Sequence, residues 1–367
     1  MKTEKCGMPV LRSNTAERGR SAEYGVAGLS ALQPFRPRKG RLQLSTSILV
    51  ASSALVLAAA VAASAVARSR EWQGLADAAG RLSRTDLLQK AAHAKQTAQL
   101  AENHLRQAKL SAGIQPDPGL SRSDSPWLGD ELTPLVTTLG SLEAKRVASS
   151  PDWARVLTVR LYDAGVRPGS VVTAGCSGSF PALNLALACA CQTLDAELLA
   201  VSSVTASTWG ANQPGFTWPE IESRLVGAGI IRPISVAVAM GGQGDLALGL
   251  DPSALPLARQ IQETTAARLG VAALSPTSLP DAVNQRLECY KRHARGRRIV
   301  LYVNVGGTEA SLGESAASLR LRSGFIPAKR FDLSPRRGVI ARFAEDGVPT
   351  LSLLHAEGLA WRWGVEP

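Results

Sequence analysis

A serine, an aspartate and a histidine follow predicted strands of this sequence in the order in which α/β-hydrolases use them. Ser177 lies in GCSGSF (residues 175–180), between an apolar run and a helical pattern, while Asp245 and His355 each follow a later apolar run. In such a triad the histidine takes the serine proton and the acid orients the histidine. The pattern G-x-S-x-G is incomplete here, because Ser179 stands where the last glycine belongs. The catalytic hypothesis is therefore a serine-dependent hydrolase or transferase that uses Ser177, Asp245 and His355.

Four predicted strands are followed by loops rich in glycine, serine or threonine, at residues 175–179, 202–210, 241–245 and 304–309. The carboxyl ends of parallel strands share one edge of a sheet, where α/β proteins bind their ligands. Glycine lets a backbone approach a ligand closely, and helix N-termini offer unpaired N–H groups to an anion. The sequence therefore predicts a small-anion site at this edge. Its candidate binding residues are Gly175, Ser177, Gly178, Ser179, Asn184, Gly241, Gly242, Asp245, Asn304, Gly306 and Gly307.

These loops also have an ordinary structural explanation, because turns between strands and helices are built from the same residue types. Ser179, directly before Phe180 and Pro181, is a good helix N-cap. Asp245 and Glu309 could also meet across neighbouring loops as an acid and a base. The sequence alone leaves these alternatives open.

Motifs for nucleotides and metals are missing from the sequence. Neither a Walker A pattern nor G-x-G-x-x-G occurs, since GCSGSF carries no lysine and its glycine spacing differs. The four histidines are scattered, with no H-E-x-x-H and no paired His/Cys spacing. We therefore expect no metal and no cofactor.

Short β-branched runs alternate with longer helical patterns from residue 115 to the end. The predicted strands are residues 170–174, 198–204, 234–240, 298–305 and 350–354, and the predicted helices are residues 151–165, 180–194, 218–228, 253–269, 279–294 and 335–347. Continuously apolar strands separated by helices indicate a parallel sheet that is covered on both faces. The sequence predicts a doubly wound α/β domain with a mostly parallel sheet over residues 115–367.

The N-terminal part predicts a membrane anchor. Residues 1–47 form a basic, polar leader without an apolar period, which is typical of disorder. Residues 48–67 form an uncharged run of the length that a transmembrane helix needs, although Ala65-Val66-Ala67 would also suit signal-peptide cleavage. The excess of Lys and Arg before the run places the N-terminus in the cytoplasm. We expect a single-pass protein of the cell membrane whose α/β domain is extracytoplasmic.

Residues 68–114 are predicted to form a helical stalk. Its heptad stripe is made mostly of alanine: Leu87, Ala91, Ala94, Ala98, Ala101, Leu105 and Ala108. Such a stripe could form the seam of a homodimer above the membrane. Alternatively, the helix could lie on the α/β domain, because alanine seams bury little apolar area.

The balance of charge indicates an anionic partner. The chain of 367 residues has a formal net charge of +11, and its isoelectric point is near 9.9. A membrane surface and an acidic polymer fit this sign. No zinc-finger spacing and no aromatic RNA-binding motif accompanies the charge, so we do not expect nucleic acid as the partner.

The combination of motifs over roughly residues 85–367 resembles the bacterial family called poly-gamma-glutamate system protein. The motifs that carry the resemblance are TTLGSLEAKR at 137–146, GCSGSFPALN at 175–184, ASTWGAN at 206–212, FTW at 216–218, GG at 241–242 with GL at 249–250, and NVGG at 304–307 with SLG at 311–313. Cys176 departs from the pattern, where a bulky apolar residue is expected.

The resemblance implies a membrane-anchored accessory protein that works with the machinery that makes and exports poly-γ-glutamate, an anionic capsule polymer. It supplies no catalytic residues. The alternatives are the serine-dependent enzyme acting on the γ-glutamyl polymer and a module that binds a small anion.

Overall fold

The computed structural model describes residues 82–121, 124–314, 321–328 and 338–366, which all belong to one unit of the chain. The predicted leader (1–47) and the predicted membrane anchor (48–67) lie outside the described residues. No helix within the described ranges is long and apolar enough to cross a membrane.

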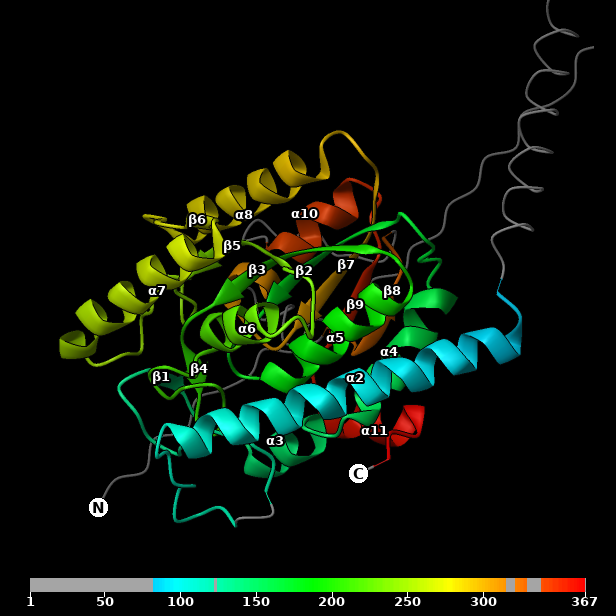
Figure 1. Cartoon of the computed structure of the whole chain (residues 1–367). Coiled ribbons are helices and arrows are strands. Elements are labelled where there is room, and N and C mark those ends of the chain that lie inside the picture. Colours follow the sequence, from blue (N-terminus) through cyan, green and yellow to red (C-terminus); the bar gives the residue numbers. More distant parts are fainter. Residues whose placement is uncertain (1–81, 122–123, 315–320, 329–337, 367) are drawn as a thin grey trace, which may run out of the picture. The chain divides into compact units, whose positions relative to one another are not determined.

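A seven-stranded sheet forms the centre of the described chain, in the order β6-β5-β3-β2-β7-β9-β8 (Figure 1). Its strands are β2 (Val171–Cys176), β3 (Glu197–Ser203), β5 (Ser235–Ala239), β6 (Ala272–Ala273), β7 (Ile299–Val305), β8 (Gly324–Ile326) and β9 (Thr350–Leu353). All neighbours pair in parallel except β8, which is antiparallel to β9. The predicted α/β fold with a mostly parallel sheet is confirmed.

The chain begins the sheet at its centre and then builds outward in two directions. From β2 it proceeds to β3, β5 and β6, and it then returns to β7 on the other side of β2. The direction of winding therefore changes between β2 and β7. In open α/β sheets the crevice at this change is the usual ligand site.

Helices cover both faces of the sheet because the central strands are apolar on both sides. The side chains of Val172 and Ala174 join one core, while those of Val171, Leu199 and Tyr302 join the other. The first core is closed by α2 (Arg84–Ser111), α4 (Asp152–Asp163), α5 (Pro181–Thr193), α6 (Trp218–Gly227) and α11 (Ala356–Trp363). The second is closed by α8 (Leu279–Ala294) and α10 (Val339–Glu345), while α7 (Leu255–Leu269) packs on the β5 and β6 edge (Figure 1).

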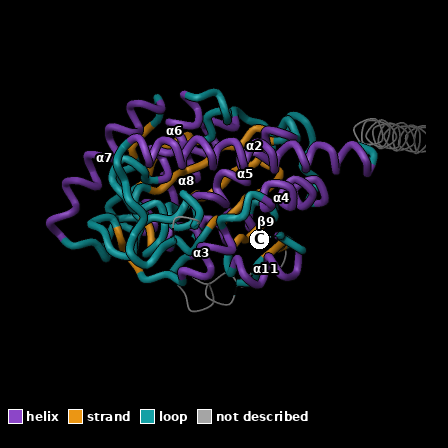
Figure 2. Tube along the Cα trace, turned by 60° about the horizontal axis from the view of Figure 1, so that its bottom comes forward, coloured by secondary structure: helices purple, strands orange, loops and turns teal. Residues whose placement is uncertain are grey.

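The long helix α2 packs on the α/β domain and does not stand away from it as a stalk. Its alanine stripe, which includes Ala94, Ala98 and Ala101, is buried against α4 and α5 (Figures 1 and 2). Small side chains allow the close approach of helices that such packing needs. The stalk expectation is thus corrected for residues 84–111, and the face expected to form a dimer seam is occupied within the chain.

A small second sheet was not predicted from the sequence. It joins β1 (Val136–Thr138) to β4 (Ala206–Ser207) in parallel, with Thr138 opposite Ser207. The short helices α3 (Leu142–Ala148) and α9 (Glu309–Leu312) were also missed, since each has few residues and no apolar period. At the start of α6, Thr217 and Glu220 form a capping box, in which the Glu220 carboxylate accepts the Thr217 backbone N–H at 3.0 Å.

Substituting Ala101 with glutamate is expected to lower the free energy of unfolding by about 3 kcal/mol, because the carboxylate would be buried without a partner. Ala101 is fully buried, whereas the adjacent Leu100 is 58% exposed. Leu100→Glu is therefore the matched control and is expected to change stability little. Urea unfolding of both variants measures the difference. Equal stabilities would show that α2 does not pack as described.

Candidate functional site

The loops after β2, β3, β5 and β7 line one pocket at the carboxyl edge of the sheet, with a volume of about 330 Å³. The β1–α3 segment closes it with residues 137–141 and Lys145. The pocket-lining residues of the four loops are Ser177, Ser179 and Phe180 after β2, Thr205 and Ser207 after β3, Gly242 and Gln243 after β5, and Gly307, Thr308 and Glu309 after β7. The structure thus brings the four polar loops together at the point where the winding changes direction.

The loop after β2 is held from both sides. The Ser177 backbone N–H donates to the Val305 carbonyl at 3.3 Å, and the Asn184 amide donates to the Ser177 carbonyl at 2.8 Å. The Ser177 hydroxyl oxygen accepts the Ser179 N–H at 3.1 Å. A Cβ at position 178 would lie 2.7 Å from the Thr205 carbonyl oxygen, so only glycine fits there. Asn184 and Gly178 therefore position this loop and do not line the pocket.

Ser179 does not act as the N-cap of α5, contrary to the sequence-based alternative. The N-cap position of α5 is Phe180, which has no side-chain capping bond. The Ser179 hydroxyl oxygen instead accepts the Ser207 N–H at 3.0 Å and so joins the loop after β2 to β4. The serine is used for a contact between loops that sequence spacing could not reveal.

The loop after β7 packs directly on Ser177. The Asn304 amide donates to the Gly306 carbonyl at 2.8 Å, and Gly306 has a φ of +85°. A Cβ at position 306 would lie 2.9 Å from the Ser177 Cβ, so glycine permits the contact. Gly175 faces Asn304 across the β2–β7 ladder. Among the candidate binding residues Gly175, Ser177, Asn304, Gly306 and Gly307, only Ser177 and Gly307 line the pocket.

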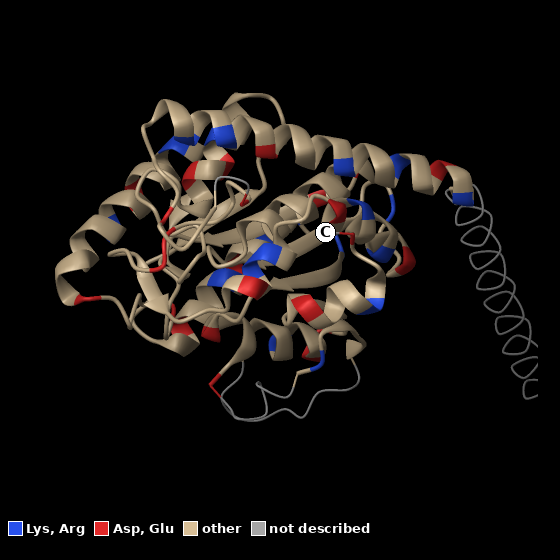
Figure 3. Cartoon of the chain, turned by 90° about the horizontal axis from the view of Figure 1, so that it is seen from below, with Lys and Arg blue, Asp and Glu red and all other residues tan. Residues whose placement is uncertain are grey.

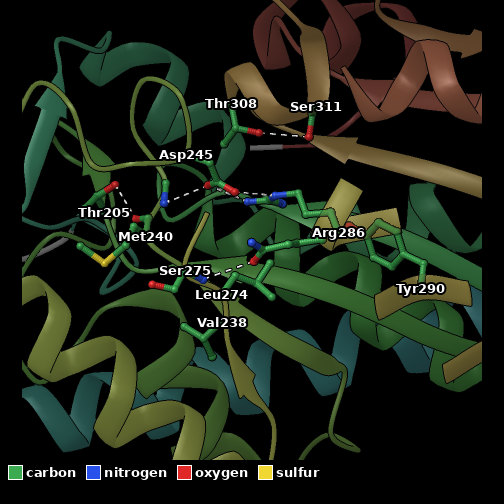
Figure 4. A network of polar contacts seen from close by, with 12 residues as sticks. Thr205, Val238, Met240, Asp245, Leu274, Ser275, Arg286, Tyr290, Thr308 and Ser311 are labelled. Carbon is green, nitrogen blue, oxygen red and sulfur yellow. Dashed lines mark hydrogen bonds and ion pairs between the residues drawn. The ribbon is translucent and has the colours of Figure 1, made fainter. Parts of the chain in front are cut away.

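The loop after β5 is fixed by a buried ion pair between Asp245 and Arg286 (Figure 4). The Arg286 guanidinium donates to both Asp245 carboxylate oxygens, at 2.7 and 2.8 Å. One of these oxygens also accepts the Gly241 N–H at 3.1 Å. Burial alone would lower the pKa of Arg286, but the charge and hydrogen bonds of Asp245 raise it above its usual value. Asp245 is therefore committed to holding the loop in place.

The structure does not assemble the triad hypothesised from the sequence. The Asp245 carboxylate is turned to Arg286, and His355 is an exposed residue at the start of α11 that does not line the pocket. Within the described ranges, no hydrogen bond joins Ser177 to Asp245 or to His355. The sequence order of a triad occurs here without its geometry.

The polar group that sequence reasoning missed is Lys145 of α3. Its side chain is 3% exposed, and its amine lies 3.9 Å from the centroid of the Phe180 ring. The amine donates to the Ser207 hydroxyl at 2.8 Å and to the Ser179 carbonyl. No carboxylate of the described chain forms an ion pair with it, and burial lowers its pKa to about 7. In the sequence, Lys145 lies between Ala144 and Arg146, and no apolar period around it indicates that its side chain is buried.

Glu309 is the acidic side chain of the pocket wall. Its carboxylate accepts the Gly244 N–H at 2.8 Å and thereby joins the loops after β7 and β5. The two loops meet as anticipated, but Asp245 and Glu309 do not form an acid–base pair, because Asp245 faces Arg286. No cluster of three metal-ligating side chains occurs in the described part of the chain. The pocket presents hydroxyl groups, glycine-rich backbone, one carboxylate and the Lys145 amine.

Replacing Lys145 with methionine is expected to stabilise the protein near neutral pH, because the variant buries no ionisable amine. The pKa of Lys145 falls from 10.5 to about 7 on folding. Between these values the unfolded chain carries a proton that the folded chain lacks, so wild-type stability rises with pH, by up to about 1.4 kcal/mol per pH unit. The Lys145→Met variant has no amine at this position, so its stability does not show this rise with pH. Its advantage in urea unfolding should be largest at about pH 6 and shrink toward about pH 9.

Lys291→Met removes an exposed amine and serves as the control for this comparison. Its unfolding free energy is expected to follow the wild-type pH dependence. If Lys145→Met also follows the wild type at every pH, the amine is not desolvated in the folded protein.

Comparison with known proteins adds no relative to this description. The chain matches no family model, no curated protein and no solved structure. The resemblance to the poly-gamma-glutamate system family therefore stays a prediction from the sequence motifs, and the function is argued from the geometry of the pocket.

Proposed function

We propose that the pocket at the carboxyl edge of the sheet binds a carboxylate group of an anionic ligand and that Lys145 is its partner. The observation that carries this proposal is the buried Lys145 amine, which lines the pocket without forming an ion pair in the described chain. A buried cation without a counter-ion is costly, so a pocket that holds one is complementary to an anion.

The remaining groups of the pocket suit the same ligand. Ser207 and Ser179 contact the Lys145 amine, and Thr308 and Gly307 also line the pocket. Hydroxyl groups and glycine-rich backbone can donate to carboxylate oxygens. A hydrogen bond from a charged donor contributes more than a neutral one, about 1.5–3 kcal/mol. A volume of about 330 Å³ is at the small end of ligand sites, so the pocket fits one or two units of a chain.

The family resemblance suggests poly-γ-glutamate as the source of this carboxylate. Each unit of that polymer carries a free carboxylate beside an amide linkage, and the chain as a whole has a net charge of +11. Basic and acidic residues are interspersed over the face shown in Figure 3, so this view offers no single-sign surface for the polymer. Recognition of the polymer is accordingly assigned to the pocket.

In this proposal the protein is an accessory component of poly-γ-glutamate synthesis or export, attached to the membrane by residues 48–67. Its extracytoplasmic domain would hold the end of a polymer chain next to the synthesis and export machinery. No observation favours Ser177 as the nucleophile of a hydrolase, since its hydroxyl oxygen accepts a backbone N–H and has no hydrogen bond to a base among the described residues.

Calorimetric titration of the full-length protein with a γ-linked glutamate dimer tests the proposal. The dimer is expected to bind, and the same dimer with its carboxylates capped as amides is not. Lys145→Met should weaken binding about 10- to 100-fold, because a charge-assisted hydrogen bond is lost. Affinity should also fall as the pH rises above about 7, where the amine loses its proton.

Lys145→Arg and Lys291→Met are the controls of the titration. Arginine keeps the positive charge and should retain most of the binding, while Lys291 lies outside the pocket and should not affect it. Equal affinity for the free and the capped dimer, or for wild type and Lys145→Met, would contradict carboxylate binding at this pocket. If the amount and length of surface polymer are unchanged in a producing strain that carries Lys145→Met, the accessory role is contradicted, while carboxylate binding at the pocket is not.

A further inference from the structure

Ser207 and Lys145 form a hydroxyl–amine pair inside the pocket. The Ser207 hydroxyl oxygen lies 2.8 Å from the Lys145 amine nitrogen, and both side chains are buried and line the pocket. Ser207 is fixed in place by its pairing with Thr138 of β1 and by the bond from its N–H to the Ser179 hydroxyl. A nucleophile within hydrogen-bond reach of a base, each held by the fold, is the arrangement that covalent catalysis requires.

The Lys145 amine lies close enough to Ser207 to take its proton. In the structure the amine donates to the Ser207 hydroxyl oxygen at 2.8 Å and to the Ser179 carbonyl, and the Ser207 O–H donates to the Thr208 carbonyl at 3.5 Å. A neutral amine has two N–H groups and one lone pair, so after rotation of the hydroxyl this lone pair can accept the Ser207 O–H over the same 2.8 Å. Because burial lowers the pKa of Lys145 to about 7, the neutral form is available near neutral pH.

The other three serines of the pocket lack these properties. The Ser141 hydroxyl oxygen accepts the Ala144 N–H as the N-cap of α3, the Ser177 hydroxyl oxygen accepts the Ser179 N–H, and the Ser179 hydroxyl oxygen accepts the Ser207 N–H. None of the three hydroxyls has a hydrogen bond to an amine, imidazole or carboxylate in the described part of the chain. The geometry therefore singles out Ser207.

We propose that Ser207 is the nucleophile of an acyl-transfer reaction and that Lys145 is the base that deprotonates it. The inference rests on the proposed function, because cleavage of the amide releases a carboxylate of the kind that the pocket is proposed to bind. Its substrate class is an amide whose acyl group becomes a carboxylate next to Lys145, as in a γ-glutamyl linkage.

In the first step, Lys145 takes the proton of the Ser207 hydroxyl, and the oxygen forms a bond to the carbonyl carbon of the amide. The C–N bond then breaks, and the leaving amine takes the proton from Lys145. The acyl group is now an ester of Ser207. Water attacks this ester and gives one proton to Lys145, the ester bond breaks, and Lys145 returns that proton to the Ser207 oxygen. The product leaves as a carboxylic acid, which loses its remaining proton to solvent and becomes the carboxylate. An amine that replaces water in the second step gives transfer instead of hydrolysis.

Labelling of the full-length protein with a fluorophosphonate, followed by peptide mass spectrometry, locates the nucleophile. The label is expected on Ser207. Ser207→Ala and Lys145→Met should each slow labelling about 100-fold or more, because the nucleophile or its general base is removed. Label on Ser177 or Ser179, or labelling that Ser207→Ala leaves unchanged, would overturn the assignment.

The variant Lys145→Arg separates the base from the cation. Arginine stays protonated, so this variant should bind the γ-linked dimer but fail to cleave a γ-glutamyl p-nitroanilide. In the wild type, cleavage should rise with pH through about 7, while binding of free carboxylate falls. Cleavage by Lys145→Arg at the wild-type rate would exclude Lys145 as the base.

Ser207→Ala keeps the pocket cation but removes one hydroxyl, so it is expected to bind the γ-linked dimer at most about 10-fold more weakly than the wild type, and retained binding also shows that the variant is folded. Ser207→Cys provides a second variant, since a thiol can replace the hydroxyl as nucleophile. Binding by the wild type without labelling or cleavage at Ser207 would reject the acyl-transfer step and leave the proposed function intact. Cleavage at Ser207 without binding of the free carboxylate would reject the proposed binding function and leave the acyl-transfer step standing.

Discussion

The parallel pairing of β2 with both β3 and β7 is the constraint on which the rest of the site depends. It places Gly175 opposite Asn304 and the two following loops side by side, and the winding of the chain changes direction at this point. Parallel strands direct all their carboxyl ends to one edge, so four loops that are far apart in the sequence converge there. The pocket is a consequence of this topology.

The fold holds the converging loops rigid with buried polar contacts. Asp245 and Arg286 fix the loop after β5, Asn184 fixes the loop after β2, and Asn304 fixes the loop after β7. None of these four side chains lines the pocket, whose wall includes glycine and hydroxylated residues together with Phe180, Gln243 and Glu309. In contrast, Lys145 faces the pocket without an ion-pair partner in the described chain, and its cost to stability is offset in part by the Phe180 ring. The proposed function of Lys145 therefore opposes its effect on stability.

Much of the fold could be predicted from the sequence, because buried parallel strands and amphipathic helices leave periodic patterns. The edge that carries the polar loops followed from the same patterns. The role of the α2 alanine stripe was ambiguous, since a heptad of alanines suits a dimer seam and a helix on the domain equally well. The site residues were harder, since Lys145 and Ser207 meet only through the fold of β4 against β1 and α3. Asp245 was read as a catalytic acid because its partner Arg286 lies in a distant helix.

The titration of the Lys145 amine tests the central claim most directly. In full-length protein labelled with ¹³C and ¹⁵N at lysine, the Lys145 signal is identified as the one that Lys145→Met removes, and its shift is followed against pH by NMR. A buried amine without a counter-ion should titrate at about 7 in the absence of ligand. A titration at the ordinary value of 10.5 would contradict the account, because Lys145 would then be solvated or paired and would provide neither the anion site nor the base.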